Sequence, residues 1–101
     1  MVVVMRTNAF SNWLTGLRDP RASAKITTRI DRLRIGNPGD ARPVGMGVSE
    51  LRIHYGPGYR VYFFQRGPDL IILLGGGDKT TQDQDIEAAL ALAVELREKN
   101  P

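Results

Sequence analysis

Alternation of apolar and polar residues dominates the middle of the chain and predicts a β-meander. Strands are predicted over residues 48–55, 59–65 and 70–74, separated by turns rich in glycine and proline. The first two runs alternate, as expected for strands with one apolar and one polar face. The third run is apolar throughout, which is typical of a strand that is covered on both faces.

The loop at residues 56–58 decides which faces of the first two strands coincide. With Tyr55 opposite Tyr59, even-numbered residues pair with even-numbered ones, and His54 lies opposite Arg60. A two-residue loop would instead place Arg60 among core residues, at the cost of burying an unpaired guanidinium. The pairing predicts a sheet with an apolar back and a polar front. That front carries Glu50, Arg52, His54, Arg60 and Tyr62.

Other segments predict one more strand and three helices around this meander. The short β-branched run at residues 2–5 predicts an edge strand. Apolar residues at helical spacing then predict a helix capped by Thr7 or Asn8 and a second helix from Pro20 to about residue 35. A C-terminal helix is predicted over residues 81–99, with acids in its first turn and cations in its last.

The second helix carries a basic stripe, rotated by about 100° from its apolar stripe. Its members are Arg21, Lys25, Arg29 and Arg32. They form either a solvated surface or a ridge that faces an anion or a partner. The following residues, 37–47, are rich in glycine and proline without periodicity, so they are predicted to be a loop.

Three consecutive glycines, Gly75–Gly77, are predicted to end the third meander strand and to turn the chain. The turn would bring Asp78 and Lys79 back towards the edge of the sheet. The GxxxxGK[ST] spacing of a phosphate-binding loop is absent, so the glycines do not indicate a nucleotide site.

Length and composition limit the classes of protein to consider. A chain of 101 residues predicts one domain over residues 1–101 with a single modest core. The absence of cysteine excludes disulfides and thiolate metal sites, and a single histidine argues against a histidine-based one, so neither metal nor cofactor is expected. No run approaches the ~18 apolar residues of a membrane span. We therefore expect a cytoplasmic protein without membrane contact.

Several segments resemble a known group of small proteins. They are residues 10–14 (FSNWL), 29–33 (RIDRL), 45–52 (GMGVSELR), 58–62 (GYRVY) and 75–79 (GGGDK), followed by 82–83 (QD) and 85–86 (DI). Together with the predicted order β-α-α-β-β-β-α, they make the chain similar to the RelE/ParE toxin superfamily, and more closely to HigB-like addiction module killer proteins. The resemblance implies an α+β, RelE-like fold with a small, mainly antiparallel sheet, two N-terminal helices and one C-terminal helix.

The resemblance also implies a function. Such proteins are toxins of type II toxin–antitoxin systems, neutralised by a cognate antitoxin that is often of the helix-turn-helix type. RelE-type and HigB-type members cleave mRNA on the ribosome, so we expect a ribosome-dependent, metal-independent endoribonuclease that inhibits translation. One alternative is a non-catalytic inhibitor of DNA gyrase in the ParE manner. Another is a degenerate toxin that only binds its antitoxin.

RNA cleavage through the 2′-OH needs a base, cations at the phosphate and a proton donor for the leaving oxygen. The catalytic candidates are Glu50, Arg52, His54, Arg60 and Lys79. Either Glu50 or His54 could be the base, while the three cations hold the phosphate. The resemblance places Arg60 on the phosphate-binding arginine of the nuclease members. The RNA-binding candidates are Arg21, Lys25, Arg29, Arg32 and Tyr62.

Two observations complicate this assignment. Glu50 and Arg52 are neighbours on one face, so they could simply form a surface ion pair. The best-understood nuclease members also have a histidine or tyrosine near the C-terminus, whereas this chain has neither after Tyr62. Either Lys79, together with the strand residues, supplies that function, or cleavage is slow, or the chain does not cleave RNA.

Overall fold

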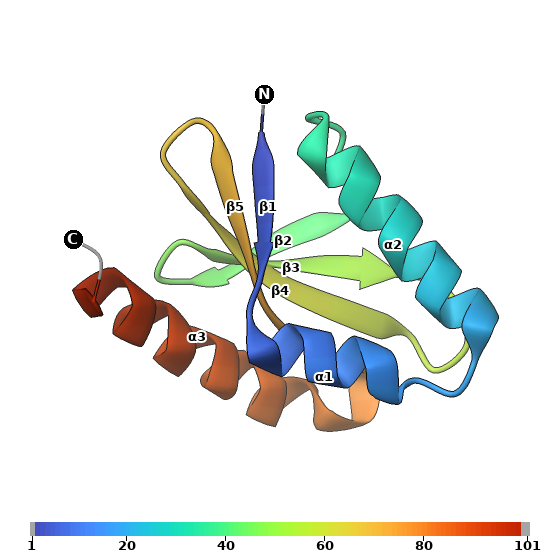
Figure 1. Cartoon of the computed structure of the whole chain (residues 1–101). Coiled ribbons are helices and arrows are strands. Elements are labelled where there is room, and N and C mark those ends of the chain that lie inside the picture. The colour runs from blue at the N-terminus through green and yellow to red at the C-terminus, as the bar shows by residue number, and fades with distance from the viewer. Residues whose placement is uncertain (1, 100–101) are drawn as a thin grey trace.

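A five-stranded sheet separates two helices from a third in the computed structural model of the chain, which describes residues 2–99 (Figure 1). The elements in chain order are β1 (Val3–Arg6), α1 (Asn8–Gly16), α2 (Pro20–Arg34), β2 (Ala41–Gly45), β3 (Val48–Ile53), β4 (Tyr59–Arg66), β5 (Leu70–Gly77), the 3₁₀ turn η1 (Lys79–Thr81) and α3 (Gln82–Lys99). The fold class predicted from the sequence is confirmed.

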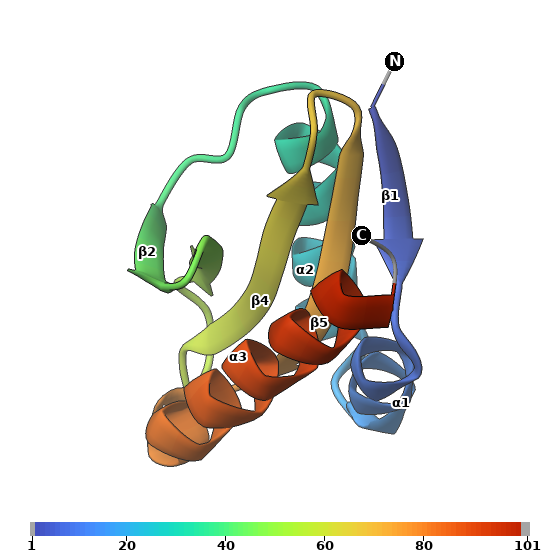
Figure 2. The ribbon, with the colours of Figure 1, turned by 90° about the vertical axis from the view of Figure 1, so that its left-hand side faces the viewer.

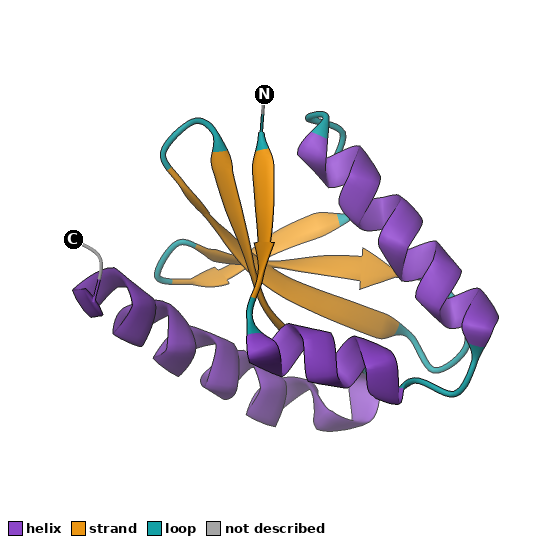
Figure 3. Ribbon diagram, viewed as in Figure 1, coloured by secondary structure: helices purple, strands orange, loops and turns teal. Residues whose placement is uncertain are grey.

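The strands lie in the order β1-β5-β4-β3-β2, so β1 and β2 form the two edges (Figure 3). Neighbouring strands are antiparallel except for β1, which runs parallel to β5. A parallel pair needs a crossover connection. Here the connection along the chain from β1 to β5 comprises all the elements from α1 to β4. The predicted N-terminal edge strand is therefore present.

Each face of the sheet has its own hydrophobic core, because α1 and α2 pack on one face and α3 on the other (Figures 1 and 2). Phe10 of α1 and Ile26 of α2 are fully buried against odd-numbered residues of β3 and β4. Ala89 and Ala93 of α3 bury the even-numbered Tyr62 and Phe64. The small alanines let the helix lie close to the sheet.

Local sequence explains where the first two helices begin. The side chain of Thr7 accepts a hydrogen bond from the amide of Phe10, and Asp19 accepts one from the amide of Arg21. Pro20 occupies the first turn of α2, where a missing N–H costs nothing. Both helix starts agree with the sequence prediction.

The pairing of β3 with β4 differs from the prediction by two residues. Ile53, rather than Tyr55, lies opposite Tyr59, and Arg52, rather than His54, lies opposite Arg60. The connection is therefore longer than three residues, and Gly56 and Gly58 within it have positive φ angles of 55° and 82°. A shift by two preserves the parity, so even-numbered side chains still share one face.

A strand was missed in the segment predicted to be a loop. Residues 41–45 form β2, antiparallel to β3, with a register irregularity between Pro43 and Gly45. Proline and glycine suppress the strand signal in the sequence, but both are tolerated in an edge strand with a bulge. Met46, at φ 53°, and Gly47, at φ 77°, then make the turn into β3.

The three glycines are the last three residues of β5, so the strand ends with them as predicted but is three residues longer than the predicted range 70–74. Close packing explains them better than flexibility does. A Cβ atom on Gly76 would lie 2.3 Å from the indole of Trp13, and one on Gly77 would overlap a carboxylate oxygen of Asp85. A Cβ on Gly75 would meet nothing within 4 Å. Two of the three glycines are thus required by side chains of α1 and α3.

Replacing Gly76 by alanine is expected to destabilise the domain by about 1–3 kcal/mol, because the added methyl group overpacks against Trp13. Gly75→Ala is the matched control, since the site has space for a methyl group and no positive φ. Urea unfolding of both variants measures the difference. Equal stabilities would contradict this packing.

The predicted polar front is not an open surface, because α3 covers much of it. Glu50 is 3% exposed, Arg60 4% and Tyr62 0%. The sequence pattern did not predict that α3 would pack over this face. Its alanines and leucines lie on several sides of the helix, so they do not indicate which face of the sheet it contacts. An opening remains where the connection between β3 and β4 meets η1, just before α3 begins.

Candidate active site

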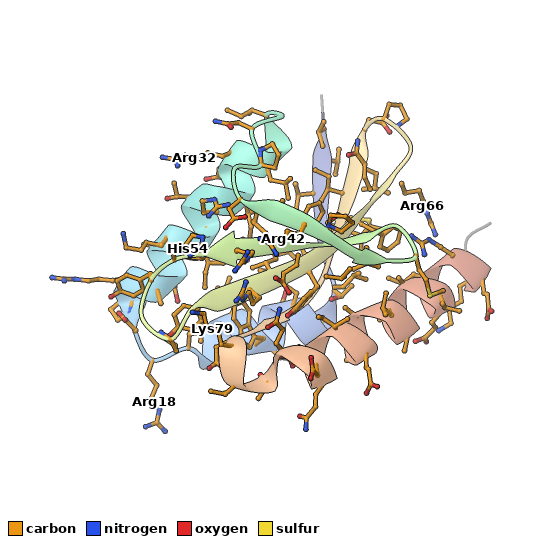
Figure 4. The ribbon with its side chains drawn as sticks, turned by 180° about the vertical axis from the view of Figure 1, so that it is seen from behind. Arg18, Arg32, Arg42, His54, Arg66 and Lys79 are labelled. Carbon is orange, nitrogen blue, oxygen red and sulfur yellow. The ribbon has the colours of Figure 1, made fainter. Side chains whose placement is uncertain are left out.

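The opening is a polar pocket of about 240 Å³, formed by the ends of β3 and β4, their connecting loop and the start of η1. Its lining residues are Arg52, Ile53, His54, Tyr55, Gly56, Gly58, Arg60 and Lys79. Four of them carry a basic side chain and none is an acid. We call it the arginine pocket. Figure 4 shows His54 and Lys79 on the face that is turned away from the viewer in Figure 1.

The connecting loop brings Lys79 into this pocket. A Cβ atom on Gly58 would lie 2.9 Å from Cε of Lys79, so only glycine allows the loop and this side chain to approach so closely. Asp78 supports the same arrangement, because its side chain accepts hydrogen bonds from both the amide and the hydroxyl of Thr80. These bonds lower the pKa of the Asp78 carboxyl and cap η1.

Arg60 is held by a buried carboxylate. Its Nη1 donates to Oε1 of Glu50 at 3.0 Å, and Nε2 of Gln82 donates to Oε2 of Glu50 at 2.8 Å. Both oxygens of Glu50 are therefore engaged, and the side chain is 3% exposed. In this geometry Glu50 fixes the arginine and the first residue of α3, and it offers no free oxygen to a substrate.

Two guanidinium N–H groups of the arginine pocket lack a hydrogen-bond partner within residues 2–99. They are Nε of Arg52 and Nε of Arg60, both buried. The Nε of Arg52 lies 3.9 Å from carboxylate oxygens of Asp40 and of Glu50, which is too far for a hydrogen bond. A buried donor without a partner costs about 1–3 kcal/mol.

His54 is paired with an aspartate that the sequence analysis did not select. Its Nε2 lies 2.5 Å from Oδ2 of Asp40, and the imidazole is 67% exposed. The hydrogen bond from His54 is the main reason that the pKa of Asp40 is below its ordinary value, and the charge of Arg52 acts in the same direction. The pair therefore stabilises the fold above the ordinary carboxyl pKa, and this contribution is lost as the pH falls through the lowered pKa.

Asp40 is itself positioned by Arg29 of α2. The guanidinium donates to the carbonyl oxygens of Arg52 at 2.6 Å, Pro38 at 2.9 Å and Asp40 at 3.4 Å. Burial lowers the pKa of Arg29, while the charge of Asp40 raises it. Arg29 was predicted to bind RNA, but its donors already join α2 to the strand end and to the loop before β2. Its place in the fold is internal.

The other predicted RNA-binding residues have different surroundings. Tyr62 is 0% exposed beneath α3, so it presents no surface on which a base could stack. Burial, followed by the charge of Glu50, raises the pKa of Tyr62. Lys25 lies 5.2 Å above the ring of Tyr55, whose hydroxyl donates to Asp19. Arg21 and Arg32 are exposed on α2.

Tyr62→Phe is expected to leave the stability unchanged or to raise it by about 1 kcal/mol. The hydroxyl is buried without a hydrogen-bond partner within the described residues, so its removal takes away a desolvation cost and no bond. Thermal unfolding of the variant beside the wild type measures the effect. A loss of 2 kcal/mol or more would mean that the hydroxyl forms a hydrogen bond in solution.

The structure thus brings Arg52, His54, Arg60 and Lys79 together, as expected, and moves Glu50 behind them. Asp40, Gln82 and the internal role of Arg29 were missed. The only signal for Asp40 was its place in a loop that leads into the polar strand. Such a position does not identify a contact partner, because the loop could follow many paths.

Within residues 2–99, no three histidine, aspartate or glutamate side chains gather as metal ligands would. None of the helices in that range is long and apolar enough to cross a bilayer. A larger hollow of about 660 Å³ beside β1 and α3 is mostly apolar, lined by Met5, Leu70, Ile72, Leu92 and Leu96 among others.

The chain matches a protein family over most of its length. The model of the Gp49-like family of phage-derived proteins covers residues 12–98. An uncharacterized protein of Haemophilus influenzae is 50% identical to the chain over 95 residues, which make up 94% of this chain and 96% of the relative. The matched span includes every residue that lines the arginine pocket.

Proposed function

Because the chain belongs to the Gp49-like family, which is toxin-like and related to RelE-type addiction modules, we propose that it is the toxin of a type II toxin–antitoxin pair. Its activity, in this proposal, is metal-independent cleavage of mRNA on the ribosome. The cognate antitoxin, often a helix-turn-helix protein in related systems, neutralises it. Mature ribosomes and translated messages are its targets, so it acts in the cytoplasm.

The observation that carries the proposal is a polar pocket whose lining has four basic side chains, two of them arginines, and no acid. A phosphodiester is an anion with several acceptor oxygens, and arginine binds it in a bidentate manner. Arg52 and Arg60 hold the scissile phosphate and stabilise the extra negative charge of the pentacoordinate transition state. Glu50 keeps Arg60 in place and is a positioning residue.

His54 is the base in this proposal. Its Nε2–H donates to Asp40, which leaves Nδ1 to take the proton of the ribose 2′-OH. Asp40 then stabilises the imidazolium that forms, as a carboxylate does for histidine bases in general. Glu50 is the weaker candidate, because both of its oxygens already accept hydrogen bonds.

Lys79 is the proton donor for the leaving 5′-oxygen in this proposal. The 2′-oxygen forms a bond to phosphorus, the bond from phosphorus to the 5′-oxygen breaks, and Lys79 gives a proton to that leaving oxygen. The products are a 2′,3′-cyclic phosphate and a 5′-OH. Lys79 lines the pocket beside Arg60 and takes the place of the C-terminal histidine or tyrosine that this chain lacks.

A reconstituted translation reaction tests the proposal. Ribosomes stalled on an end-labelled message are mixed with the purified domain, and the new RNA ends are identified chemically. Cleavage within the A-site codon with a 2′,3′-cyclic phosphate end is expected, and addition of a metal chelator should not slow it. An intact message together with inhibited gyrase supercoiling would favour the ParE-like alternative. No effect on either would indicate a degenerate toxin.

A further inference from the structure

A second hollow adjoins the arginine pocket on the side of α2. It has a volume of about 440 Å³ and lies between residues 24–32 of α2 and residues 53–55 at the end of β3. We call it the helix groove. Ile53, His54 and Tyr55 line both hollows, so this short segment is the ridge between them. A chain molecule could cross the ridge and occupy both.

The helix groove is basic and contains no acid among its lining residues. Three cations of α2 face it, but they differ in what they already bind. Arg29 donates to backbone carbonyl oxygens and is committed to the fold. Lys25 and Arg32 are exposed, and Lys25 is held over the ring of Tyr55 at the edge of the groove. These two cations remain available to a ligand.

The shape and chemistry of the groove favour a polynucleotide backbone over an isolated base. Its polar side chains are three cations, His54 and the hydroxyls of Thr28 and Tyr55, and it has no carboxylate or side-chain amide. Arg32, His54 and Lys79 lie along the same side of the molecule (Figure 4). A strand with one phosphate beside Lys79 would therefore continue over His54 towards Arg32.

We propose that the helix groove is a second subsite for single-stranded RNA, which binds the nucleotide next to the scissile phosphate through Lys25 and Arg32. The subsite rests on the proposed function, because it takes the strand whose scissile phosphate occupies the arginine pocket. It recognises the sugar–phosphate backbone and not the sequence. RNA must therefore extend by at least one nucleotide beyond the cleaved bond to bind fully.

Binding of short RNAs that cannot be cleaved tests this subsite. The probe is a fluorescently labelled tetranucleotide with 2′-O-methyl riboses, and its affinity is measured by anisotropy over a range of salt concentrations. The double variant Lys25→Gln/Arg32→Gln is compared with Arg18→Gln/Arg34→Gln, which removes the same charge outside both hollows. All four side chains are exposed, so each variant is expected to fold, as circular dichroism would verify.

Each phosphate neutralised on a single strand contributes about 0.7 to the slope of log K against log salt, so the groove variant, which no longer neutralises one phosphate, should lose about 0.7 of that slope. The control variant should keep the wild-type slope. A dinucleotide, which fills the arginine pocket alone, should bind both variants equally. Equal tetranucleotide binding by the two double variants, or no salt-dependent binding by the wild type, would overturn the subsite.

Cleavage on ribosomes separates this inference from the function on which it rests. If the groove variant loses tetranucleotide affinity but the wild type does not cleave mRNA, the subsite stands and the nuclease assignment fails. If the groove variant binds and cleaves as the wild type does while Arg60→Lys is inactive, the nuclease assignment stands and the subsite fails.

Discussion

Arg60→Lys is expected to lower mRNA cleavage by about a hundredfold while the domain remains folded. The lysine keeps the positive charge next to Glu50, so the buried carboxylate is still paired. It loses the planar fork that binds Glu50 and a phosphate at once. Rates of cleavage on stalled ribosomes, with Arg34→Lys as the control on the surface of α2, measure the effect.

Alanine at the same position would have a second consequence. Arg60 is 4% exposed and its partner Glu50 is 3% exposed, so Arg60→Ala leaves a buried carboxylate without its cation. Breaking such a pair costs about 3–5 kcal/mol, which is a large part of the stability of a small domain. An inactive alanine variant therefore says little by itself. Full activity of folded Arg60→Lys, in contrast, would remove Arg60 from the site of phosphate binding.

His54→Gln is expected to lower the rate of cleavage by about 10²–10⁴-fold, the usual contribution of a positioned general base. The imidazole is 67% exposed, so the variant should stay folded and lose only the small stabilisation that its pair with Asp40 contributes. Asp40→Asn keeps the size of the orienting side chain but removes its charge, and a smaller loss is expected. Single-turnover cleavage measures both variants.

Two patterns would contradict the role of His54. Wild-type rates in His54→Gln would assign the base to another group, with Glu50→Gln as the next variant to measure. An Asp40→Asn variant that loses more activity than His54→Gln would indicate that Asp40 acts on the substrate directly. In each of these variants the new side chain is similar in size to the original one, so differences in activity do not arise from large changes in packing.

The periodicity of the sequence was sufficient to predict the meander, the edge strand at the N-terminus and the starts of α1 and α2. Alternation reports which residues share a face, and this parity was correct even though the register of β3 and β4 differed by two residues. The register itself depends on the path of residues 54–58. Several loops that contain Gly56 and Gly58 would satisfy the same alternation, so the pattern could not choose among them.

The role of individual polar residues was harder to predict, because it depends on what packs over them. Glu50, Arg52, Arg60 and Tyr62 share one face, but only the path of α3 buries Glu50 and Tyr62 and leaves the end of the strands open. Arg29 belongs to the basic stripe by periodicity, yet three carbonyl oxygens from distant segments surround its guanidinium. Contacts between segments far apart in the chain leave no periodic signal.

The most direct test of the proposed activity is to map RNA 5′ ends in cells after induction of the protein without its antitoxin. The proposal predicts new ends at fixed positions within the codons of translated messages, together with growth arrest, and the loss of both in Arg60→Lys. Growth arrest with intact messages, or new ends that persist unchanged in Arg60→Lys, would contradict cleavage by the arginine pocket.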